Sequence, residues 1–244
     1  MISFVPPYYG WLGNQMFQYA CVKALSLREG VGCSFPEKTP NLHDIFALSA
    51  KKDFKQDTEE TLRLYKEPRF TYTEIPVGYR DLILEGYFQS EKYFIDCKDV
   101  IREEFTFKNP VNYEVTPGSC SIHVRRGDYL NIQKDHPLCD MEYYNKAMKL
   151  MGSDNYLVFS DDPDWCSDHF KGDQFTIVSG NTAEEDMQIM SKCDDNIIAN
   201  SSFSWWAAWL NTNEQQRVVA PGKWFGDITG METTDLYLKD WIIL

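Results

Sequence analysis

The sequence predicts an α/β protein whose second half is built around a parallel sheet. Short apolar runs alternate with helical patterns between residues 120 and 220, and such alternation is typical of a parallel sheet with helices on both faces. The chain has 244 residues, of which 43% are hydrophobic, enough for one large core or two small ones. Residues 108–118 contain two prolines and no clear periodicity, which indicates a linker between two halves.

The first half has a less regular pattern. Apolar positions on one face predict a helix that opens at Gly13 and runs to about Glu29, with Gly30 as its C-cap. Residues 38–74 are polar and give no clear assignment, and the charges of residues 51–60 are interpreted as a solvated face or loop. The other expected elements are strands over 2–5, 31–35 and 82–85, a loop at Pro6 and Pro7, and a helix over 91–104.

The second half gives clearer boundaries. Thr182 and Glu185 have the spacing of a capping box, which predicts the start of a helix at Thr182. Other helices are expected over 142–151, after Pro163 and from about Ser201. The strands are expected over 120–124, 156–160, 175–178, 196–199 and 218–220.

The bulk properties exclude several classes of function. The net charge of -13 opposes sequence-independent nucleic-acid binding, because phosphate backbones are also negative. The 7 cysteines include no Cys-x-x-Cys pair and are interpreted as reduced thiols. No apolar run reaches the roughly 18 residues of a membrane span, and the amino terminus lacks the pattern of a signal peptide. We therefore expect a cytoplasmic protein without an integral membrane segment.

The run from Ser121 to Tyr129 reads Ser-Ile-His-Val-Arg-Arg-Gly-Asp-Tyr and places two arginines at a strand end. A guanidinium at the end of a buried strand requires an anion, which is either a ligand phosphate or a protein carboxylate such as Asp128. Consecutive side chains of a strand point to opposite faces. We therefore assign Arg125 to the ligand, on the face of His123, and Arg126 to bracing the site. The embedded Arg-Gly-Asp is interpreted as incidental.

Polar clusters follow two further strands. Asp161 and Asp162 could hold a metal ion or bind a nucleoside, and the arginines favour metal-free neutralisation of a pyrophosphate. Ser201 or Ser202 could cap a helix whose first amides suit a phosphate, or cap it without any ligand. Carboxyl ends of parallel strands meet at one edge, so these clusters are expected to converge on one site. The tryptophans at 205, 206 and 209 are assigned to the core rather than to a sugar platform.

Several motifs together resemble the bacterial α-1,2-fucosyltransferases of glycosyltransferase family 11. The resemblance spans nearly the whole chain. Its motifs are Gly13-Asn-Gln-Met-Phe-Gln-Tyr-Ala20, Gly86-Tyr-Phe-Gln-Ser-Glu-Lys-Tyr-Phe94, His123-Val-Arg-Arg-Gly-Asp-Tyr129, Phe159-Ser-Asp-Asp162, Asp186-Met187 and Asn196-Ile-Ile-Ala-Asn-Ser-Ser-Phe-Ser-Trp-Trp206.

The resemblance implies a GT-B-like fold, with two Rossmann-like halves whose parallel sheets face a cleft. Residues 1–112 would form the acceptor-side domain and residues 113–244 the GDP-fucose-binding domain, with the final residues able to pack back on the first. It implies GDP-fucose as co-substrate, a glycan acceptor, inversion at the anomeric carbon, and neither a metal nor another cofactor. The implied reaction is fucosyl transfer to O2 of a terminal galactose in surface polysaccharide synthesis.

The resemblance also implies roles for individual residues. The catalytic residues would be Arg125, Asn14 and Asp128, where Asp128 and His123 either act as general base or orient the arginines. Trp11 and Gln15 would lie on the acceptor side. The donor-binding residues would be His123, Arg125, Arg126, Asp161, Asp162, Asn200, Ser201, Ser202, Phe203 and Ser204.

Three positions depart from the family pattern. Trp11 stands where the family usually has the second Gly of Gly-Gly-Leu-Gly-Asn, Asp195 where it often has His, and Ala207 where it has Gly. The departure at Trp11 bears on the acceptor. A non-catalytic nucleotide-sugar or glycan binding module and a fucosyltransferase with another acceptor are the alternatives. A lipid-linked acceptor would add peripheral attachment to the inner membrane.

Overall fold

The chain forms two compact units. In the computed structural model, the described residues are 1–4, 10–35, 42–50, 63–78, 81–227 and 231–244. Unit 1 comprises Met1–Asn109 and Gly230–Tyr237, and unit 2 comprises Pro110–Thr229 and Leu238–Leu244. Both units contain a parallel sheet, so the α/β class predicted from the sequence is confirmed.

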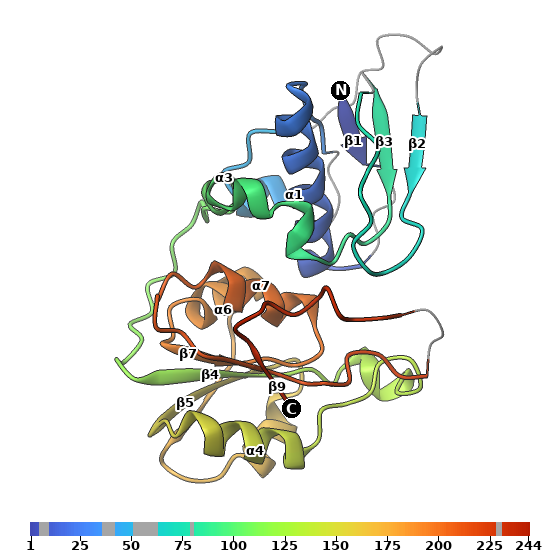
Figure 1. The fold of residues 1–244 in the computed structure, drawn as a ribbon. Coiled ribbons are helices and arrows are strands. Elements are labelled where there is room, and N and C mark those ends of the chain that lie inside the picture. The colour runs from blue at the N-terminus through green and yellow to red at the C-terminus, as the bar shows by residue number, and fades with distance from the viewer. Residues whose placement is uncertain (5–9, 36–41, 51–62, 79–80, 228–230) are drawn as a thin grey trace. The chain divides into compact units, whose positions relative to one another are not determined.

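Unit 1 is built on a three-stranded parallel sheet and one long helix (Figure 1). The strand order is β1-β3-β2, with β1 at Ile2–Phe4, β3 at Leu82–Glu85 and β2 at Arg63–Lys66. Helix α1 spans Leu12–Glu29 and ends at Gly30, whose φ of 61° is the left-handed conformation that glycine adopts readily. The core between them is aromatic: the Tyr19 and Phe35 rings meet edge to face at 5.4 Å.

Two elements of unit 1 differ from the prediction. The helix expected over 91–104 is divided into η1 (Glu91–Tyr93), η2 (Ile95–Cys97) and α3 (Lys98–Glu104). The division falls at Phe94, whose φ of -142° is not helical and whose fully buried ring packs 6.4 Å from that of Phe17. The strand expected over 31–35 is reduced to an isolated bridge between Ile2 and Cys33. A short helix, α2, covers Leu42–Ile45.

Unit 2 contains a six-stranded parallel sheet in the order β6-β5-β4-β7-β8-β9. All five strands expected from the sequence are present, with boundaries that differ by at most two residues. The sixth, β9 at Ile242–Ile243, pairs with β8 at the sheet edge and was not predicted. The other strands are β4 (Ser119–Val124), β5 (Asn155–Ser160), β6 (Phe175–Val178), β7 (Asp195–Ile197) and β8 (Val218–Ala220).

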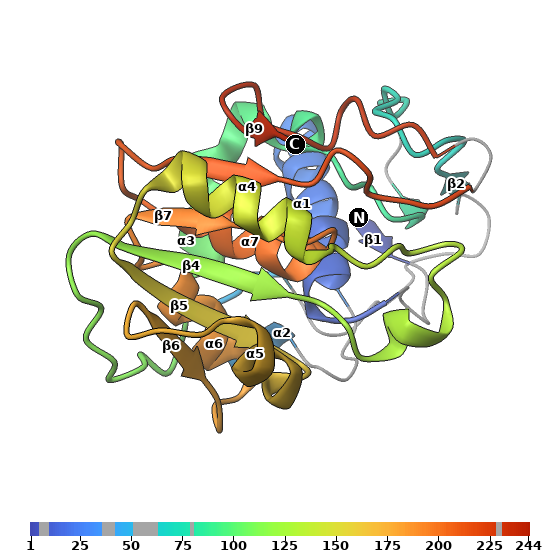
Figure 2. The same cartoon turned by 90° about the horizontal axis from the view of Figure 1, so that it is seen from below.

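Helices cover both faces of this sheet (Figures 1 and 2). Helices α4 (Met141–Met151) and α5 (Pro163–His169) share one buried cluster with the central strands, whereas α6 (Ala183–Met190) and α7 (Ser202–Leu210) lie on the opposite face. The capping box predicted at Thr182 is present in full. The helices expected in this half are thereby confirmed. A 3-10 turn, η3 (Asp128–Asn131), follows β4.

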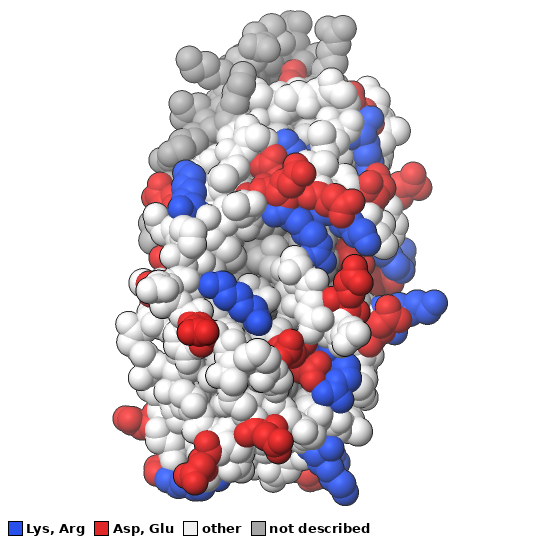
Figure 3. Space-filling view, turned by 90° about the vertical axis from the view of Figure 1, so that its left-hand side faces the viewer, with Lys and Arg blue, Asp and Glu red and all other residues white. Residues whose placement is uncertain are grey.

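Charge is distributed without a broad basic area on the face shown in Figure 3, where basic and acidic side chains lie next to each other. Within the described ranges, no helix has the length and apolar character needed to cross a membrane. The loop expected at Pro6 and Pro7 and the solvated charges expected over 51–60 lie outside the described residues.

A candidate active site at the carboxyl ends of two strands

The register of β4 and β5 brings the arginines and the paired aspartates together. Val124 pairs with Ser160 at the ends of these two parallel strands. The residues that follow each strand therefore lie next to each other, at the carboxyl edge where such sheets bind ligands. The predicted convergence of these two clusters is what the structure shows.

Arg125 is held between two carboxylates. Its Nη1 donates to Asp161 and its Nη2 donates to Asp128, and its guanidinium lies 5.1 Å from the centre of the Tyr129 ring. The protein-carboxylate alternative considered for this arginine is thus present in the structure. Both terminal nitrogens of the fork donate to a carboxylate, so an anion that approaches this end of the guanidinium competes with Asp161 or Asp128.

Arg126 is braced on three sides. Its Nε donates to Asp162 at 2.9 Å, its backbone N–H donates to Asp161 Oδ1 at 2.9 Å, and its guanidinium lies 4.2 Å from the centre of the Trp165 ring. The hydrogen bond from Arg126 lowers the pKa of Asp162, which also caps α5 through the Trp165 N–H. These contacts are those of a residue that supports its neighbours.

Gly127 permits this close arrangement. A Cβ atom at this position would lie 2.5 Å from Asp161 Oδ2, a distance that non-bonded atoms do not reach. Any side chain here would therefore push Asp161 away from Arg125. The glycine of the Arg-Gly-Asp tripeptide has a packing role within the site.

The cluster carries a net charge of -1, because three carboxylates face two guanidinium groups. The three carboxylates differ in exposure. The Asp128 side chain is 55% exposed, against 27% for Asp161 and 29% for Asp162. An exposed ion pair contributes about 0–1 kcal/mol, so Asp128 is the carboxylate that an anionic ligand replaces most readily.

His123 lies on β4 next to this cluster and is almost fully buried. Its Nδ1 is buried and has no hydrogen-bond partner in the described part of the chain, and its ring lies 5.3 Å from that of Phe203. Burial lowers the pKa of His123 to about 4, with Arg125 acting in the same direction and Asp161 against it. The ring is neutral at pH 7 and is a weak base.

The segment at the start of α7 is tied into the fold. The Asn200 side chain donates to the carbonyls of Pro137, at 2.9 Å, and Trp224, at 3.0 Å. Ser201 accepts the Phe203 N–H at 3.4 Å, which is the capping role considered for it. Tyr129 donates to the Asn200 carbonyl at 3.1 Å and so links this segment to the arginine cluster.

Several other residues of this segment also have structural contacts within the fold. The Ser204 hydroxyl donates to the backbone carbonyl of Ala199 at 3.4 Å. Trp205, Trp206 and Trp209 are buried, so their assignment to the core is confirmed. The Ser202 side chain is half-buried at the first position of α7.

Three predicted site residues lie in unit 1, at the start of α1. Trp11 is 70% exposed, Gln15 is buried and its Nε2 has no partner among the residues that the structure describes, and Asn14 Oδ1 accepts a hydrogen bond from Gln89 Nε2 at 2.8 Å. A Cβ at Gly10 would overlap the Asn14 side chain. Gly10 and Gln89 therefore fix the orientation of Asn14.

Glu67 supports the turn that carries Gln89. Its carboxylate accepts the backbone N–H groups of Tyr87 at 2.7 Å and Phe88 at 3.1 Å, and Phe88 has an unusual φ of 53°. Burial raises the pKa of Glu67 to about 7, and the two N–H groups oppose this increase. A half-buried carboxylate thus stabilises a strained turn next to Asn14.

Sequence reasoning missed four contributors to these sites. Tyr129 directly follows the Arg-Arg-Gly-Asp run, and Gln89 lies inside a motif used for the family resemblance, so position alone could have suggested both. Trp165 follows the Asp-Asp-Pro turn at helical spacing. Glu67 lies in a region without a recognisable pattern, and nothing in the sequence indicates its role.

The fold is shared with proteins that handle nucleotide sugars. The structure is similar to POFUT1 in complex with GDP-fucose, with a TM-score of 0.56 and 11% identity over 88% of this chain and 95% of that one. It is also similar to the NodZ alpha-1,6-fucosyltransferase soaked with GDP-fucose, with a TM-score of 0.52 and 11% identity over 86% and 92% of the two chains. The protein thus has a GT-B-like fold, as the resemblance implied.

Sequence comparison gives the family. The sequence model described as Glycosyl transferase family 11 matches residues 7–244. The chain is 31% identical to the alpha-1,2-colitosyltransferase of Escherichia coli, over 88% of this chain and 90% of that protein. It is 26% identical to galactoside alpha-(1,2)-fucosyltransferase 1 of Bos taurus, over 82% of this chain and 64% of that protein. The chain belongs to glycosyltransferase family 11.

A third relative, the O-antigen biosynthesis glycosyltransferase WbnK of Escherichia coli, is 37% identical over 68% of this chain and 56% of its own length. These relatives share the α-1,2 linkage or the glycosyltransferase class in their names and differ in the sugar named. Family membership therefore identifies a glycosyltransferase, and the sugars require a separate argument.

Proposed function

We propose that this protein transfers L-fucose from GDP-fucose to O2 of a terminal galactose in an acceptor glycan, with inversion and without a metal ion. The observation that carries the proposal is the Arg125 guanidinium at the end of β4. One of its donor edges is held only by the exposed carboxylate of Asp128. That edge is suited to two oxygens of a pyrophosphate once Asp128 withdraws.

In the proposed reaction the acceptor hydroxyl attacks the anomeric carbon of fucose while GDP leaves. Negative charge develops on the departing pyrophosphate, and Arg125 stabilises it where a metal ion could otherwise act. The amides in the first turn of α7, after Ser201, provide further donors at the positive end of the helix dipole. Removing one such donor typically slows turnover by about 10²–10³.

Asp128 is the residue we propose as general base. Its Oδ1 accepts from Arg125, and no described residue pairs with its Oδ2. When the pyrophosphate takes the Arg125 fork, the released carboxylate is free to accept the proton of the attacking hydroxyl. His123 is less suited to this task because its side chain is almost fully buried, whereas the Asp128 side chain is exposed.

Asn14 and Gln15 are proposed to contact the substrates from unit 1. Asn14 is oriented by Gln89, and the buried Gln15 Nε2 has no partner in the parts of unit 1 that the structure describes. Trp11 is proposed on the acceptor side, where its exposed indole would meet a sugar face. A cytoplasmic location and a role in surface polysaccharide synthesis belong to the same proposal.

Transfer of colitose is the second candidate function. The relative with 31% identity over 88% of this chain is named for colitosyl transfer. The fucosyltransferases with names that specify galactose are more distant, at 26% identity. The pyrophosphate chemistry assigned to Arg125 is the same for both donors, so the choice between them depends on the sugar pocket.

A donor and acceptor panel tests the proposal. GDP-fucose and GDP-colitose are each incubated with galactosides and other glycosides in the presence of a chelator, and GDP release and product linkage are measured. We expect GDP release with GDP-fucose and an α-1,2 linkage to galactose. Faster transfer from GDP-colitose would show that colitose, and not fucose, is the sugar transferred. Sensitivity to the chelator would contradict the proposed metal independence. Binding of GDP-fucose without GDP release would favour the non-catalytic binding module.

A further inference from the structure

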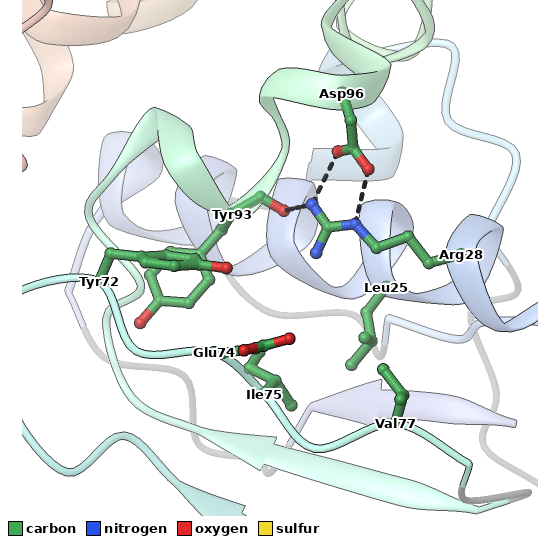
Figure 4. A pocket seen from close by; sticks show the side chains of 8 residues that line it. All are labelled: Leu25, Arg28, Tyr72, Glu74, Ile75, Val77, Tyr93 and Asp96. Atoms are coloured by element: carbon green, nitrogen blue, oxygen red, sulfur yellow. Dashed lines mark hydrogen bonds and ion pairs between the residues drawn. The ribbon is translucent and has the colours of Figure 1, made fainter.

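Unit 1 contains a hollow of about 280 Å³ that none of the proposed catalytic residues lines. Its walls come from the last turns of α1, from residues 72–77 and from the turns η1 and η2 (Figure 4). Small-molecule sites occupy about 300–1,000 Å³. A hollow of this size is suited to one small ligand.

One wall of the hollow is apolar and aromatic. Leu25 and Ile75 are buried, whereas Val77 is 60% exposed at the rim. The rings of Tyr72 and Tyr93 pack 4.9 Å apart at an angle of 57°. The exposed part of this wall, mainly Val77 and the half-buried Tyr72, is apolar or aromatic surface that an apolar ligand face could cover.

Arg28 presents a fixed hydrogen-bond donor to the hollow. Its Nε and Nη2 donate to the two carboxylate oxygens of Asp96 at 2.8 and 2.7 Å, and Nη2 also donates to the Tyr93 carbonyl at 2.7 Å. Figure 4 shows that the remaining nitrogen, Nη1, points away from Asp96 and toward Glu74 and Leu25. No described residue accepts a hydrogen bond from Nη1, so a preorganised donor remains free.

Two further polar groups of the hollow have no partner among the described residues. These are the Glu74 carboxylate, which needs donors, and the Tyr72 hydroxyl, which can donate and accept. Figure 4 shows the Glu74 carboxylate between the Tyr72 ring and the side chain of Ile75. Among the described residues, the hollow thus has one donor, one acceptor and one group of either kind without a partner.

The charges select the class of ligand. Glu74 and Asp96 outnumber Arg28, so the net charge of the lining is -1 and an anion is repelled. A simple cation would leave the Arg28 donor unsatisfied. A sugar hydroxyl both donates and accepts, and neighbouring hydroxyls of one pyranose can satisfy Glu74 and Arg28 together while its C–H face covers the apolar wall.

We propose that this hollow binds an uncharged pyranose, as a sugar site separate from the one that would hold the reacting sugars. Arg28 lies near the end of α1 and Asn14 near its start, which at 1.5 Å per residue separates them by about 21 Å along the helix. A sugar bound here belongs to a part of a glycan remote from the reacting hydroxyl, or to a free saccharide. The proposal does not depend on the donor or on the reaction.

The experiment is a titration of the full chain, without GDP-sugar, with the methyl pyranosides of galactose, glucose and N-acetylglucosamine. Binding is followed by saturation-transfer NMR and calorimetry. We expect at least one pyranoside to bind, and Glu74→Gln and Tyr72→Phe each to weaken it, Glu74→Gln by about tenfold. Glu103→Gln on α3, an exposed carboxylate away from the hollow, should leave the affinity unchanged.

The Glu74→Gln variant also shows whether the pyranoside binds in this hollow or elsewhere on the protein. Glu74 is exposed and has no partner among the described residues, so Glu74→Gln should preserve the unfolding midpoint and the rate of GDP release from GDP-fucose into water. Absence of pyranoside binding would overturn the proposal. Binding that Glu74→Gln leaves unchanged, or that inorganic phosphate displaces, would do the same, because it would place the sugar elsewhere or assign the hollow to an anion.

Discussion

Arg125 and Asp161 form an ion pair across the ends of β4 and β5. Asp161 is fixed from a second direction, because its Oδ1 accepts the Arg126 backbone N–H at 2.9 Å. The pair therefore orients the Arg125 guanidinium and leaves Asp128 as the more easily released partner. In this arrangement Asp161 positions the arginine, and Asp128 is the carboxylate that we propose the donor pyrophosphate displaces.

Replacing Asp128 by Asn separates its two proposed effects. The substitution removes a carboxylate that competes with GDP for Arg125. GDP should therefore bind as tightly as in the wild type or up to about fivefold more tightly, because an exposed ion pair contributes about 0–1 kcal/mol. Loss of the base should lower kcat by about 10²–10⁴ and remove the acidic limb of the pH profile of kcat/KM. GDP calorimetry and pH–rate profiles provide the measurements.

Asp135→Asn is the matched control, since Asp135 is exposed in the same connection and its side chain makes no hydrogen bond or ion pair with a described residue. It should leave both GDP affinity and the pH profile unchanged. A normal acidic limb in the Asp128→Asn variant would exclude Asp128 as the base and leave it an orienting role only.

The neutral, buried His123 should make stability depend on pH. Its pKa is about 4 in the folded protein and about 6.5 when unfolded, so the unfolded state binds more protons between these values. The free energy of unfolding should therefore be fully retained above pH 6.5 and decrease as the pH falls toward 4. The shift corresponds to a loss on the order of 3 kcal/mol.

Urea denaturation between pH 4 and 7.5 checks this expectation by comparing the wild type with His123→Gln, which cannot titrate. The variant should lack that part of the acid destabilisation, whereas His169→Gln, at an exposed position, should retain it. Equal slopes for the wild type and His123→Gln would show that His123 is protonated as easily in the folded state as in the unfolded state.

Gly86 should tolerate no side chain. A Cβ there would lie 2.4 Å from Glu67 Cβ, and Glu67 holds the strained turn at Phe88. Gly86→Ala should lower the free energy of unfolding by more than about 3 kcal/mol, from overpacking and lost turn contacts. Gly30→Ala, with a positive φ but no neighbour within 4 Å, should cost only about 1 kcal/mol.

Both unfolding free energies come from urea titrations of the two variants beside the wild type. The larger loss should also reach the site in unit 1, because the same turn carries Gln89 and thereby orients Asn14. If Gly86→Ala were no more destabilising than Gly30→Ala, the turn would be free to move and the support attributed to Glu67 would be wrong.

The strands of unit 2 could be predicted because strands buried on both faces of a parallel sheet are rich in apolar residues, as Tyr156–Phe159 and Val218–Ala220 are. Strand β2 could not, since Arg63–Lys66 is largely exposed at a sheet edge and two of its four residues are charged. Strand β9 is only two residues long and exposed. The break at Phe94 depends on tertiary packing, which overrides the local helical pattern.

The location of the candidate site could be predicted from the sequence, but its individual contacts could not. The rule that ligands bind at the carboxyl ends of parallel strands was enough to place Arg125 near Asp161 from the sequence. It could not reveal which carboxylate pairs with which arginine, nor that the buried Nδ1 of His123 has no partner among the described residues. Glu67 acts on residues about twenty positions away in sequence, and contacts of this kind appear only in the folded chain.

The most direct test of the account is the rate of GDP release from GDP-fucose, with a galactoside acceptor and a chelator, for the wild type, Arg125→Lys and Arg126→Lys. Lysine keeps the charge but not the two-pronged donor geometry. The account predicts metal-independent turnover that Arg125→Lys slows by about 10²–10³ and that Arg126→Lys slows less. A folded Arg125→Lys enzyme with near-normal turnover would contradict the proposed role of Arg125.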